Sequence, residues 1–522
     1  RAPMRSSIAC LRCRKSKIKC DNNGGTGPCE TCIKVGHLCQ YPEAATYVLK
    51  RSEPGKNVDR DSPHERKRIR KIDETSDNHR AATYSSEVLS YPFLTNEIWD
   101  QLFDIYKLHF ASELPFLHLP TLKERMRHGT GAHATSPGLN FVLLGVLTLT
   151  ARFHIDLVKY VAHLRQRSAQ TKPDPFAASE FFANALTEAL GPIRTTIVAP
   201  TVERAQAYLM LGLHEWRQSR SNNGLGAWMY AGIAVRLALS LRLNLGDGRY
   251  AGSEQASPNL HAGDKGPPGA AIDVGIAREI KRRTMFSCLV MDRMLACGSE
   301  RPAMIRTEDI EIQLPCTEMA FDLALDVQTG YLRSSLDGRS NPVAEDNVLA
   351  RFVQLTNIWR GITRYSIEGG RLSEQLALWD QNSRLMQLQR ELDAFNDSLP
   401  STFTLSRQNY YRHDNHQAHS IYVSLHMLSS LCQVVLHREN LPLLPLRCRQ
   451  PEGPLDQSIS STGYAPSGFW NASADRIFGA SRDIIDLVDL CRDKLPMSPL
   501  TLFAAWSAGM IAIYAHHFPA MD

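Results

Sequence analysis

The sequence predicts a mainly α-helical protein with three parts: a small cysteine-rich unit at residues 1–45, a flexible linker at 46–93 and a large all-helical domain at 94–522. Six cysteines lie close together near the start of the chain. Prolines and polar residues then interrupt any apolar periodicity. Beyond them helical periodicity is frequent and strand-like alternation is rare.

Length and composition are those of a globular protein with more than one unit. A chain of 522 residues is too long for one hydrophobic core, and 43% apolar with 22% charged residues is an ordinary balance. The polar, basic first residues do not form a signal peptide. Two apolar stretches, Phe141–Thr150 and Leu500–Tyr514, are shorter than the roughly 18–20 residues that span a bilayer. We therefore expect a soluble protein without a membrane partner.

Cysteine usage points to metal binding more than to disulfides. Without an export signal, thiols stay reduced, and clustered thiols then bind metal more often than they pair. A disulfide framework is the weaker alternative for this cluster. Each of the other six cysteines is expected to be a small buried hydrophobic residue. They are Cys288, Cys297, Cys316, Cys432, Cys448 and Cys491.

Within the cluster one spacing occurs twice. The first half is Cys10, Cys13 and Cys20, and the second half, with the same internal spacing, is Cys29, Cys32 and Cys39. Zinc takes four tetrahedral thiolate ligands at about 2.3 Å. Since two zinc ions need eight ligand positions and only six sulfurs are present, two thiolates must bridge. The repeat makes Cys10 and Cys29 equivalent, so they are the expected bridging pair.

Positive charge is concentrated in the first half of this repeat. Residues 1–45 contain eight Lys or Arg against three Asp or Glu, whereas residues 91–522 contain 41 against 43. Five cations lie between the first and third cysteines: Arg12, Arg14, Lys15, Lys17 and Lys19. A cationic helix fixed by metal attracts the phosphate backbone of DNA through counterion release. A solvated charge run without a ligand is the alternative.

These residues resemble the fungal Zn2Cys6 binuclear-cluster transcription factors, because all six cysteines fit the spacing of that family. The resemblance implies two Zn²⁺ ions and a first helix that reads a CGG-like triplet in the DNA major groove. The family's R-x-R-K-x-K stretch corresponds to residues 14–19, which puts Lys17 at the base-reading position and Ser16 where a basic residue is common. The candidate DNA contacts are Arg12, Arg14, Lys15, Ser16, Lys17 and Lys19.

Residues 46–93 are expected to form a flexible, basic linker. Pro54, Pro63 and Pro92 interrupt a stretch with few apolar residues, so no dimerising heptad repeat is expected there. The basic run Arg66–Lys71 is a nuclear-import signal, a DNA backbone contact or a solvated run. Without a coiled coil, the protein is expected to bind one triplet as a monomer or to form a homodimer through the helical domain.

Helical periodicity begins near residue 94. In 96–110 the apolar residues recur at three- and four-residue steps, as an amphipathic helix requires. A second helix is expected over 226–246, with Gly246 as its stop. Stretches rich in polar residues, Gly or Pro at 247–270, 329–346 and 449–468 are expected to be surface loops.

Four stretches of this region resemble the middle homology domain of fungal transcription factors: 114–122, 226–244, 279–316 and 434–445. The resemblance implies an α-helical regulatory domain that in some members responds to metabolites or partner proteins. In the third stretch, Arg282, Arg283 and the pair Asp292-Arg293 are expected to form interhelical ion pairs, in preference to ligand contacts.

Catalytic motifs are incomplete in this chain, and an enzyme is not expected. His214-Glu215 begins like the metalloprotease motif HExxH, but Gln218 stands where the second histidine would be. Gly224-Leu225-Gly226 does not continue as a dinucleotide-binding fingerprint, and the sequence contains no nucleophile elbow or phosphate-binding loop.

The sequence therefore predicts a nuclear, zinc-dependent, sequence-specific DNA-binding regulator of RNA polymerase II transcription. The expected partners are double-stranded DNA, the transcription machinery or co-regulators, and an unidentified small-molecule effector. The alternative is a zinc-cluster module that binds proteins without sequence-specific DNA binding. RING- and LIM-like domains also use CxxC pairs, but they include histidine ligands and lack five cations between cysteines.

Overall fold

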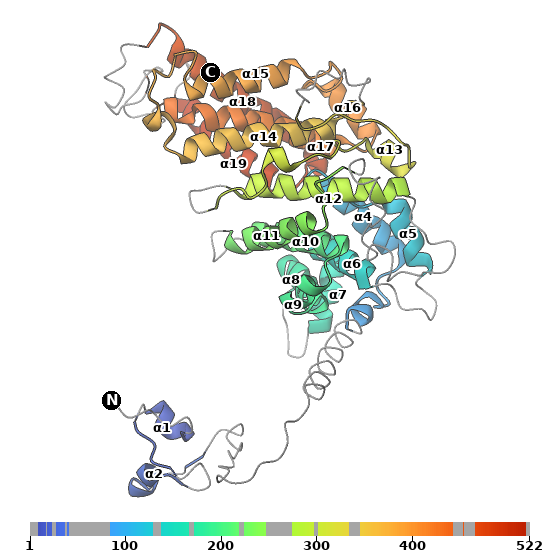
Figure 1. Ribbon diagram of the computed structural model, residues 1–522, viewed down its shortest axis with the longest axis vertical. Coiled ribbons are helices and arrows are strands. Elements are labelled where there is room, and N and C mark those ends of the chain that lie inside the picture. Colours follow the sequence, from blue (N-terminus) through green and yellow to red (C-terminus); the bar gives the residue numbers. More distant parts are fainter. Residues whose placement is uncertain are drawn as a thin grey trace, which may run out of the picture. The chain divides into compact units, whose positions relative to one another are not determined.

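A computed structural model divides the chain into two compact units, Arg1–Lys71 and Ile72–Asp522. It describes residues 9–16, 18–22, 28–36, 39–40, 84–128, 137–165, 172–218, 224–246, 274–296, 301–333, 345–441, 453 and 465–517. These residues form helices and loops but no strand, apart from isolated bridges such as the one between Gln313 and Tyr331. The predicted mainly α-helical fold is confirmed (Figure 1).

The described residues of the first unit form two short helices, α1 (Leu11–Lys15) and α2 (Glu30–Lys34). Most helices of the second unit are longer. They are α4 (Asn96–Phe110), α5 (Leu119–His128), α6 (Pro137–Thr150), α7 (Ile155–Arg165), α8 (Pro175–Leu190), α9 (Ile193–Val198), α10 (Val202–Gln218), α11 (Leu225–Ser240), α12 (Val274–Leu295), α13 (Glu318–Asp322), α14 (Val348–Ile367), α15 (Arg384–Asp397), α16 (Arg407–Asn415), α17 (His419–His437), α18 (Phe469–Cys491) and α19 (Pro499–His517).

Helix α4 confirms the periodicity argument. The side chain of Thr95 caps it by accepting a hydrogen bond from the backbone N–H of Ile98 at 3.4 Å. The predicted apolar face, from Trp99 to Phe110, is buried in the main core.

Helix α11 ends earlier than expected. It stops at Ser240, not at Gly246, because Arg242 takes a left-handed conformation with φ of 56°. The N–H of Leu243 then donates to the carbonyl of Ala238 at 3.0 Å, which is the 6→1 bond of a Schellman-type helix end. The helix therefore ends without a glycine, and the prediction from Gly246 placed its end six residues too late.

The last ten residues of the predicted linker, 84–93, pack against the helical unit. Residues 84–89 are helical, and Val88 is fully buried in the main core. Phe93 stacks on Tyr160 of α7 with ring centroids 4.8 Å apart. Burial of these side chains joins residues 84–93 to the helical unit. The rest of the predicted linker, including the basic run 66–71, lies outside the described residues.

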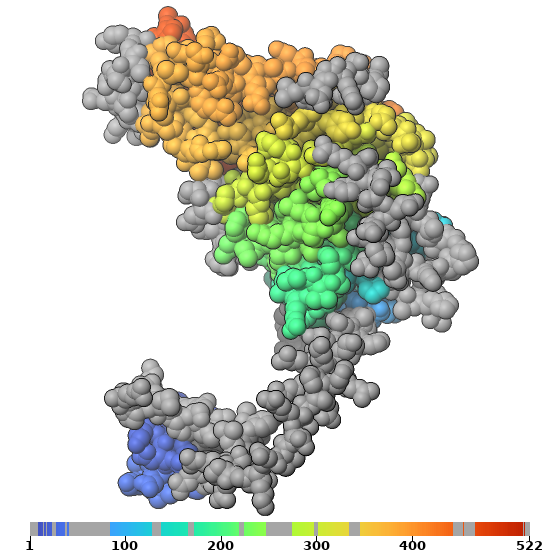
Figure 2. All heavy atoms as spheres, in the orientation of Figure 1, coloured from blue at the N-terminus to red at the C-terminus, as the bar shows by residue number. Residues whose placement is uncertain are grey.

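The helical unit has two groups of helices with α12 between them (Figure 1). Helices α6, α8, α10 and α11 pack together in the first group, and α14, α17, α18 and α19 in the second. Helix α12 contacts α10 and α11 on one side and α14 on the other, and one apolar core is continuous through both groups. The space-filling view shows the corresponding unbroken surface from green to orange (Figure 2).

Helix α17 is the central element of the second group. Together with the turn that follows, His419–Asn440 is long and apolar enough to cross a membrane, yet 89% of its apolar window is buried inside the unit. Taken together as one broken span, Pro137–Phe153 and Ile155–Leu164 are also long and apolar enough to cross a membrane. A helix that is apolar on nearly every side and buried by its neighbours, as α17 is, is a core helix.

Two further expectations concern cysteines and loops. Cys288, Cys316, Cys432 and Cys491 are buried free thiols, as expected of small hydrophobic residues. Cys297 and Cys448 lie outside the described residues, as do the predicted loop 247–270 and most of the other two.

Three buried histidines predict how stability changes with pH. Burial lowers the pKa of His109 and of His426 to about 4, and it lowers that of His437 to about 3. Each ring is neutral in the folded protein, for example where His437 Nε2 lies 2.6 Å from Gln389 Oε1. In the unfolded chain a histidine has a pKa near 6.5, so the unfolded state binds more protons between about pH 6.5 and 4.

Stability of the helical unit is therefore present above about pH 6.5 and is lost as the pH falls toward 4. At pH 5 each histidine is expected to cost on the order of 1–2 kcal/mol. Urea unfolding followed by helical circular dichroism at pH 7 and pH 5 checks this. A His437→Gln variant should show a weaker decline, and an unchanged decline would contradict the role of this ring.

Candidate metal centre and nucleic-acid interface

The sequence repeat of the first unit is also a structural repeat. Cys10 directly precedes α1 and Cys29 directly precedes α2, while Cys13 and Cys32 lie within these helices. The backbone N–H of Cys10 donates to the sulfur of Cys20 at 3.4 Å, and that of Cys29 donates to the sulfur of Cys39 at 3.3 Å. Each half thus folds its third cysteine back onto its first.

The six sulfurs form two overlapping groups of four. One group is Cys10, Cys13, Cys20 and Cys29, and the other is Cys10, Cys29, Cys32 and Cys39, with the ligand atoms of each group within 4.8 Å of one another. Cys10 and Cys29 therefore belong to both groups. This sharing is the arrangement that two bridging thiolates require.

The separations between sulfurs fit zinc. Cys10 Sγ lies 3.8 Å from Cys29 Sγ and 3.7 Å from Cys32 Sγ, and Cys13 Sγ lies 3.8 Å from Cys29 Sγ. Four sulfurs at about 2.3 Å from a central ion stand about 3.8 Å apart along the tetrahedron edges. All six cysteines are free, so none is held in a disulfide.

Burial of the cysteines also favours a cation at this place. Five of the six are buried and Cys39 is half-buried. Burial raises the pKa of Cys13 and of Cys29, whereas at Cys10 hydrogen bonds with neighbouring cysteines outweigh burial and lower the pKa to about 6. Thiolate is the form that ligates zinc, and a divalent ion supplies the compensating charge.

Contacts between the two halves hold the centre together. Thr31 Oγ1 donates to the carbonyl of Lys19 at 3.2 Å, and the N–H of Glu30 donates to the carbonyl of Asp21 at 3.0 Å. These bonds come from backbone and uncharged groups. They do not use the side chains of Lys15 and Lys19, which are exposed.

The predicted DNA contacts lie in α1 and in the few residues after it. Lys15, Ser16 and Lys19 are exposed, and Arg12 is half-buried. The side chain of Arg14 and the whole of Lys17 lie outside the described residues. The candidate residues that the structure describes thus lie on and just after one short helix that the cysteines flank.

Sequence reasoning missed Asp21. Its carboxylate lies 2.9 Å from Lys19 Nζ, and the Lys19 side chain is 84% exposed. The hydrogen bond and the charge of Asp21 raise the pKa of Lys19. Since Asp21 is two positions after Lys19, the sequence does carry a signal that these opposite charges meet.

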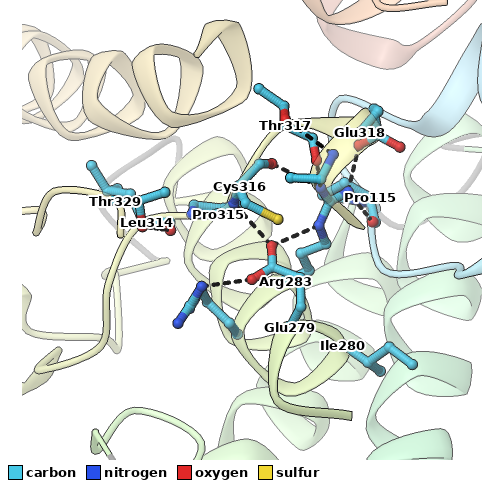
Figure 3. A network of polar contacts seen from close by, with 12 residues as sticks. Pro115, Glu279, Ile280, Arg283, Leu314, Pro315, Cys316, Thr317, Glu318 and Thr329 are labelled. Carbon is cyan, nitrogen blue, oxygen red and sulfur yellow. Dashed lines mark hydrogen bonds and ion pairs between the residues drawn. The ribbon is translucent and has the colours of Figure 1, made fainter. Parts of the chain in front are cut away.

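Arg283 of α12 is the centre of one predicted network, in which Arg282 also pairs with Glu279, at 2.7 Å (Figure 3). The side chain of Arg283 is fully buried, and its Nε donates to Glu279 Oε1 at 2.9 Å. It also pairs with Glu318 of α13 and donates to the carbonyls of Pro115 and Cys316 at 3.0 and 2.8 Å. Burial alone lowers the pKa of Arg283, but the carboxylates of Glu318 and Glu279 more than offset this and raise it.

The other predicted pair has a related role. Arg293 Nη1 donates to Asp292 Oδ2 at 2.7 Å, and Asp292 accepts the backbone N–H groups of Met304 and Ile305 at 2.8 and 3.0 Å. Both networks therefore connect α12 to loops as much as to other helices. Among the described ion pairs of these residues, the pair of Arg283 with Glu318 of α13 is the interhelical one.

His214, which begins the incomplete protease motif, is a buried core histidine. Its ring nitrogens contact Arg152, Glu180 and Gln218 at 3.0–3.4 Å. The groups around the ring are thus a guanidinium, a carboxylate and an amide. The amide of Gln218 lies 3.0 Å from Nε2 of the ring.

A thiolate centre that presents a cationic helix, followed by a large helical unit, defines a class of DNA-binding transcription regulators. Comparison with known proteins agrees in both parts. The fungal specific transcription factor domain matches residues 103–397, and the fungal Zn(2)-Cys(6) binuclear cluster domain matches residues 8–47. The chain belongs to the fungal Zn(2)-Cys(6) transcription factor family, as the sequence resemblance predicts.

Curated relatives carry matching descriptions. An uncharacterized transcriptional regulatory protein of Schizosaccharomyces pombe is 24% identical over 97% of this chain and 71% of its own length. Another from the same organism is 28% identical over 48% of this chain and 25% of its own length. The Zn(2)-C6 fungal-type transcription factor FTF1c of Fusarium oxysporum f. sp. lycopersici is 24% identical over 62% of this chain and 33% of its own length. The chain thus spans about a quarter and a third of the last two relatives.

Family membership makes the chain a DNA-binding regulator of transcription. The cluster domain of this family binds two zinc ions, and the six cysteines present two four-sulfur groups of suitable size. The predicted cofactor is confirmed at this level.

Proposed function

We propose that this protein regulates RNA polymerase II transcription in the nucleus by reading a CGG-like triplet in the DNA major groove through residues 10–20. The observation that carries the proposal is that two cysteine groups share Cys10 and Cys29, and that the helix after Cys10 has Lys15 and Ser16 exposed at its end. A helix fixed in this way can enter a groove about 12 Å wide.

Cys10, Cys13, Cys20 and Cys29 would hold one zinc ion, and Cys10, Cys29, Cys32 and Cys39 the other. Zinc supplies strong tetrahedral bonds to thiolates and no redox chemistry. The protein's own residues do the rest. The backbone N–H groups of Cys10 and Cys29 donate to the sulfurs of Cys20 and Cys39 and so orient these two ligands.

Charge divides the DNA contacts into two kinds. Six thiolates carry more negative charge than two divalent ions neutralise, so attraction to DNA must come from side chains. Arg12, Lys15 and Lys19 would contact phosphates, which position the helix without reading sequence. Lys17 would donate to guanine O6 and N7, a contact that does read sequence.

Each of the three expected parts, residues 1–45, 46–93 and 94–522, has its own role. The first binds DNA, the second contributes reach and the third is a non-catalytic regulatory domain. Residues 84–93 belong structurally to the third part because they pack on its core. We propose that this domain forms the homodimer, contacts co-regulators of the transcription machinery and receives any effector.

The second candidate is a zinc-cluster module that binds proteins without sequence-specific DNA binding. This candidate predicts that the protein binds duplexes of every sequence with the same affinity. The exposed cations around α1 favour DNA over this alternative, because they attract phosphates but would gain little from an uncharged protein surface.

Two neighbouring lysines test the proposal. Lys17→Ala is expected to lower affinity for the preferred triplet about 10- to 100-fold, because a base contact is worth about 1–3 kcal/mol of discrimination, while binding to scrambled DNA changes little. Lys19→Ala should weaken both duplexes equally and flatten the salt dependence by about one unit. Fluorescence anisotropy with both duplexes across a salt series measures these effects.

Asp21→Asn is the matched control, since it removes the charge that faces Lys19 without touching a base-reading residue. It should raise affinity for both duplexes alike. Equal, sequence-independent losses in Lys17→Ala and Lys19→Ala would contradict base reading by Lys17.

A further inference from the structure

A hollow in the helical unit lies between the first turns of α12 and residues 316–327. Its volume is about 220 Å³. A cavity of about 150 Å³ can hold benzene, so this one has room for a single ring with a small substituent. We call it the α12–α13 hollow.

One wall of the α12–α13 hollow is cationic. Arg278 and Arg282 lie one turn apart on the same side of α12, and both line the hollow. The Arg282 side chain is 14% exposed, and its Nη1 donates to Glu279 Oε2 at 2.7 Å. The other oxygen of Glu279 accepts from Arg283 Nε and from the backbone N–H of Cys316, at 2.9 and 3.0 Å (Figure 3). Both oxygens of Glu279 are thus engaged, whereas a guanidinium has donors to spare for a ligand.

The opposite wall of the hollow is apolar. It is lined by Phe321, Leu325 and Val327. Phe321 is 2% exposed, and the guanidinium carbon of Arg283 lies 4.1 Å from the centroid of its ring. Val327 packs against the small core that contains this ring, while Leu325 is 49% exposed. A ligand that fills the hollow therefore meets guanidinium groups on one side and hydrocarbon on the other.

The charges around the hollow favour a ligand with one negative charge. Asp326 also lines it, but its side chain is 86% exposed and its carboxylate lies 3.8 Å from Arg278 Nη1. Such a long, exposed ion pair contributes little, so a ligand carboxylate can replace it. Carboxylates match the planar fork of a guanidinium through parallel hydrogen bonds. A cation would be repelled by both arginines, and a dianion would be repelled by Glu279 in the same wall.

We propose that the α12–α13 hollow binds a small monocarboxylate with an apolar body about the size of one ring. The carboxylate of this ligand pairs with Arg278 and Arg282. Its apolar body packs against Phe321, Leu325 and Val327.

A ligand in this hollow contacts a network that joins several segments of the helical unit. Arg282 shares Glu279 with Arg283, and Arg283 bonds in turn to Pro115 and Glu318. Helix α12 itself contacts both groups of helices. The inference thus gives a place and a ligand class to the effector included in the proposed function. It rests on that proposal for the regulatory role alone, because binding to the hollow requires no DNA.

Isothermal titration calorimetry on the zinc-loaded full chain, without DNA, tests the inference. The two probes are phenylacetate and its neutral analogue phenylacetamide, which have nearly the same shape. Phenylacetate is expected to bind at one site per chain. Phenylacetamide should bind at least about 10-fold more weakly, because hydrogen bonds to an ionised acceptor are about twice as strong as neutral ones.

Two leucines supply a matched pair of variants. Leu325→Glu adds a carboxylate to the lining of the hollow and should weaken phenylacetate binding at least about 10-fold through like-charge repulsion. Leu323→Glu changes a residue that is 63% exposed and does not line the hollow, so this variant should bind phenylacetate like the wild type. Because both leucines are exposed, helical circular dichroism should stay unchanged in both variants.

A third variant separates a ligand contact from a structural role. Arg278→Gln should weaken phenylacetate binding about 10-fold and leave phenylacetamide binding unchanged, because it removes a charge that pairs with the ligand carboxylate alone. Equal weakening of both probes would contradict this contact.

Two other results would overturn the inference. One is a wild type that binds neither probe at millimolar concentration, or both with equal affinity. The other is equal phenylacetate binding by Leu325→Glu and Leu323→Glu, which would place the site elsewhere. Each result would leave the DNA-reading proposal intact, because the lysine variants test that proposal without these probes.

Discussion

Removal of zinc from the full chain is expected to abolish triplet-specific DNA binding and to leave the thermal unfolding of the helical unit unchanged. The described core of the first unit consists of its own cysteines, with Ala9 alone packed beside them. Such a unit has no apolar core to keep it folded without metal. In small zinc domains metal binding supplies about 10–16 kcal/mol, and this is the free energy of folding itself.

The helical unit provides the internal control for this experiment. Among the described residues, both groups of potential metal ligands lie in the first unit. Chelation should therefore reduce affinity for the preferred duplex by about 1,000-fold or more, down to the non-specific level. Anisotropy and calorimetry on the same sample measure both quantities. Specific binding that survives chelation, or a helical unit that melts earlier, would contradict this account.

Replacement of Arg283 by alanine is expected to destabilise the helical unit by about 3–5 kcal/mol. The variant would remove one of the two guanidinium partners of the buried Glu279 carboxylate, which keeps Arg282 at 2.7 Å, and it would also unpair Glu318. It would further leave the carbonyls of Pro115 and Cys316 without their donor. Because whole domains are stable by only about 5–15 kcal/mol, this loss is a large share of the total.

The matched control is Arg364→Ala on α14. Arg364 also pairs with a glutamate four residues away, at 2.7 Å from Glu368, but these two side chains are 68% and 57% exposed. An exposed pair contributes at most about 1 kcal/mol. Urea unfolding followed by helical circular dichroism compares the two variants at one pH. Equal losses would show that burial of Arg283 does not set its contribution.

The cluster was predictable because its information is local. Repeated spacing of Cys10 to Cys20 and Cys29 to Cys39 fixes which sulfurs can meet, and the structure groups them in the way that spacing indicates. The pairing of Lys19 with Asp21 is equally local. It was missed because a count of charges over a segment does not show which charges meet. Helix α4 was predictable for a similar reason, since one helix face shows its burial in its own periodicity.

Other features depend on parts of the chain that are far apart. The bond from Arg283 to the carbonyl of Pro115 joins residues 168 positions apart, and no motif announces it. Helix α17 is apolar on nearly every side, so its sequence does not reveal which face packs on which neighbour. The burial of Val88 shows the same difficulty on a smaller scale, because a short helical segment has too few residues for a clear period.

Zinc content per chain tests the central claim most directly. If Cys10 and Cys29 bridge two ions, elemental analysis of the purified full chain should give two zinc ions for the wild type. Cys39→Ser should keep one ion, and Cys10→Ser should lose both. One zinc ion in the wild type, or equal losses in Cys10→Ser and Cys39→Ser, would contradict the shared-sulfur centre on which the proposed DNA-reading helix depends.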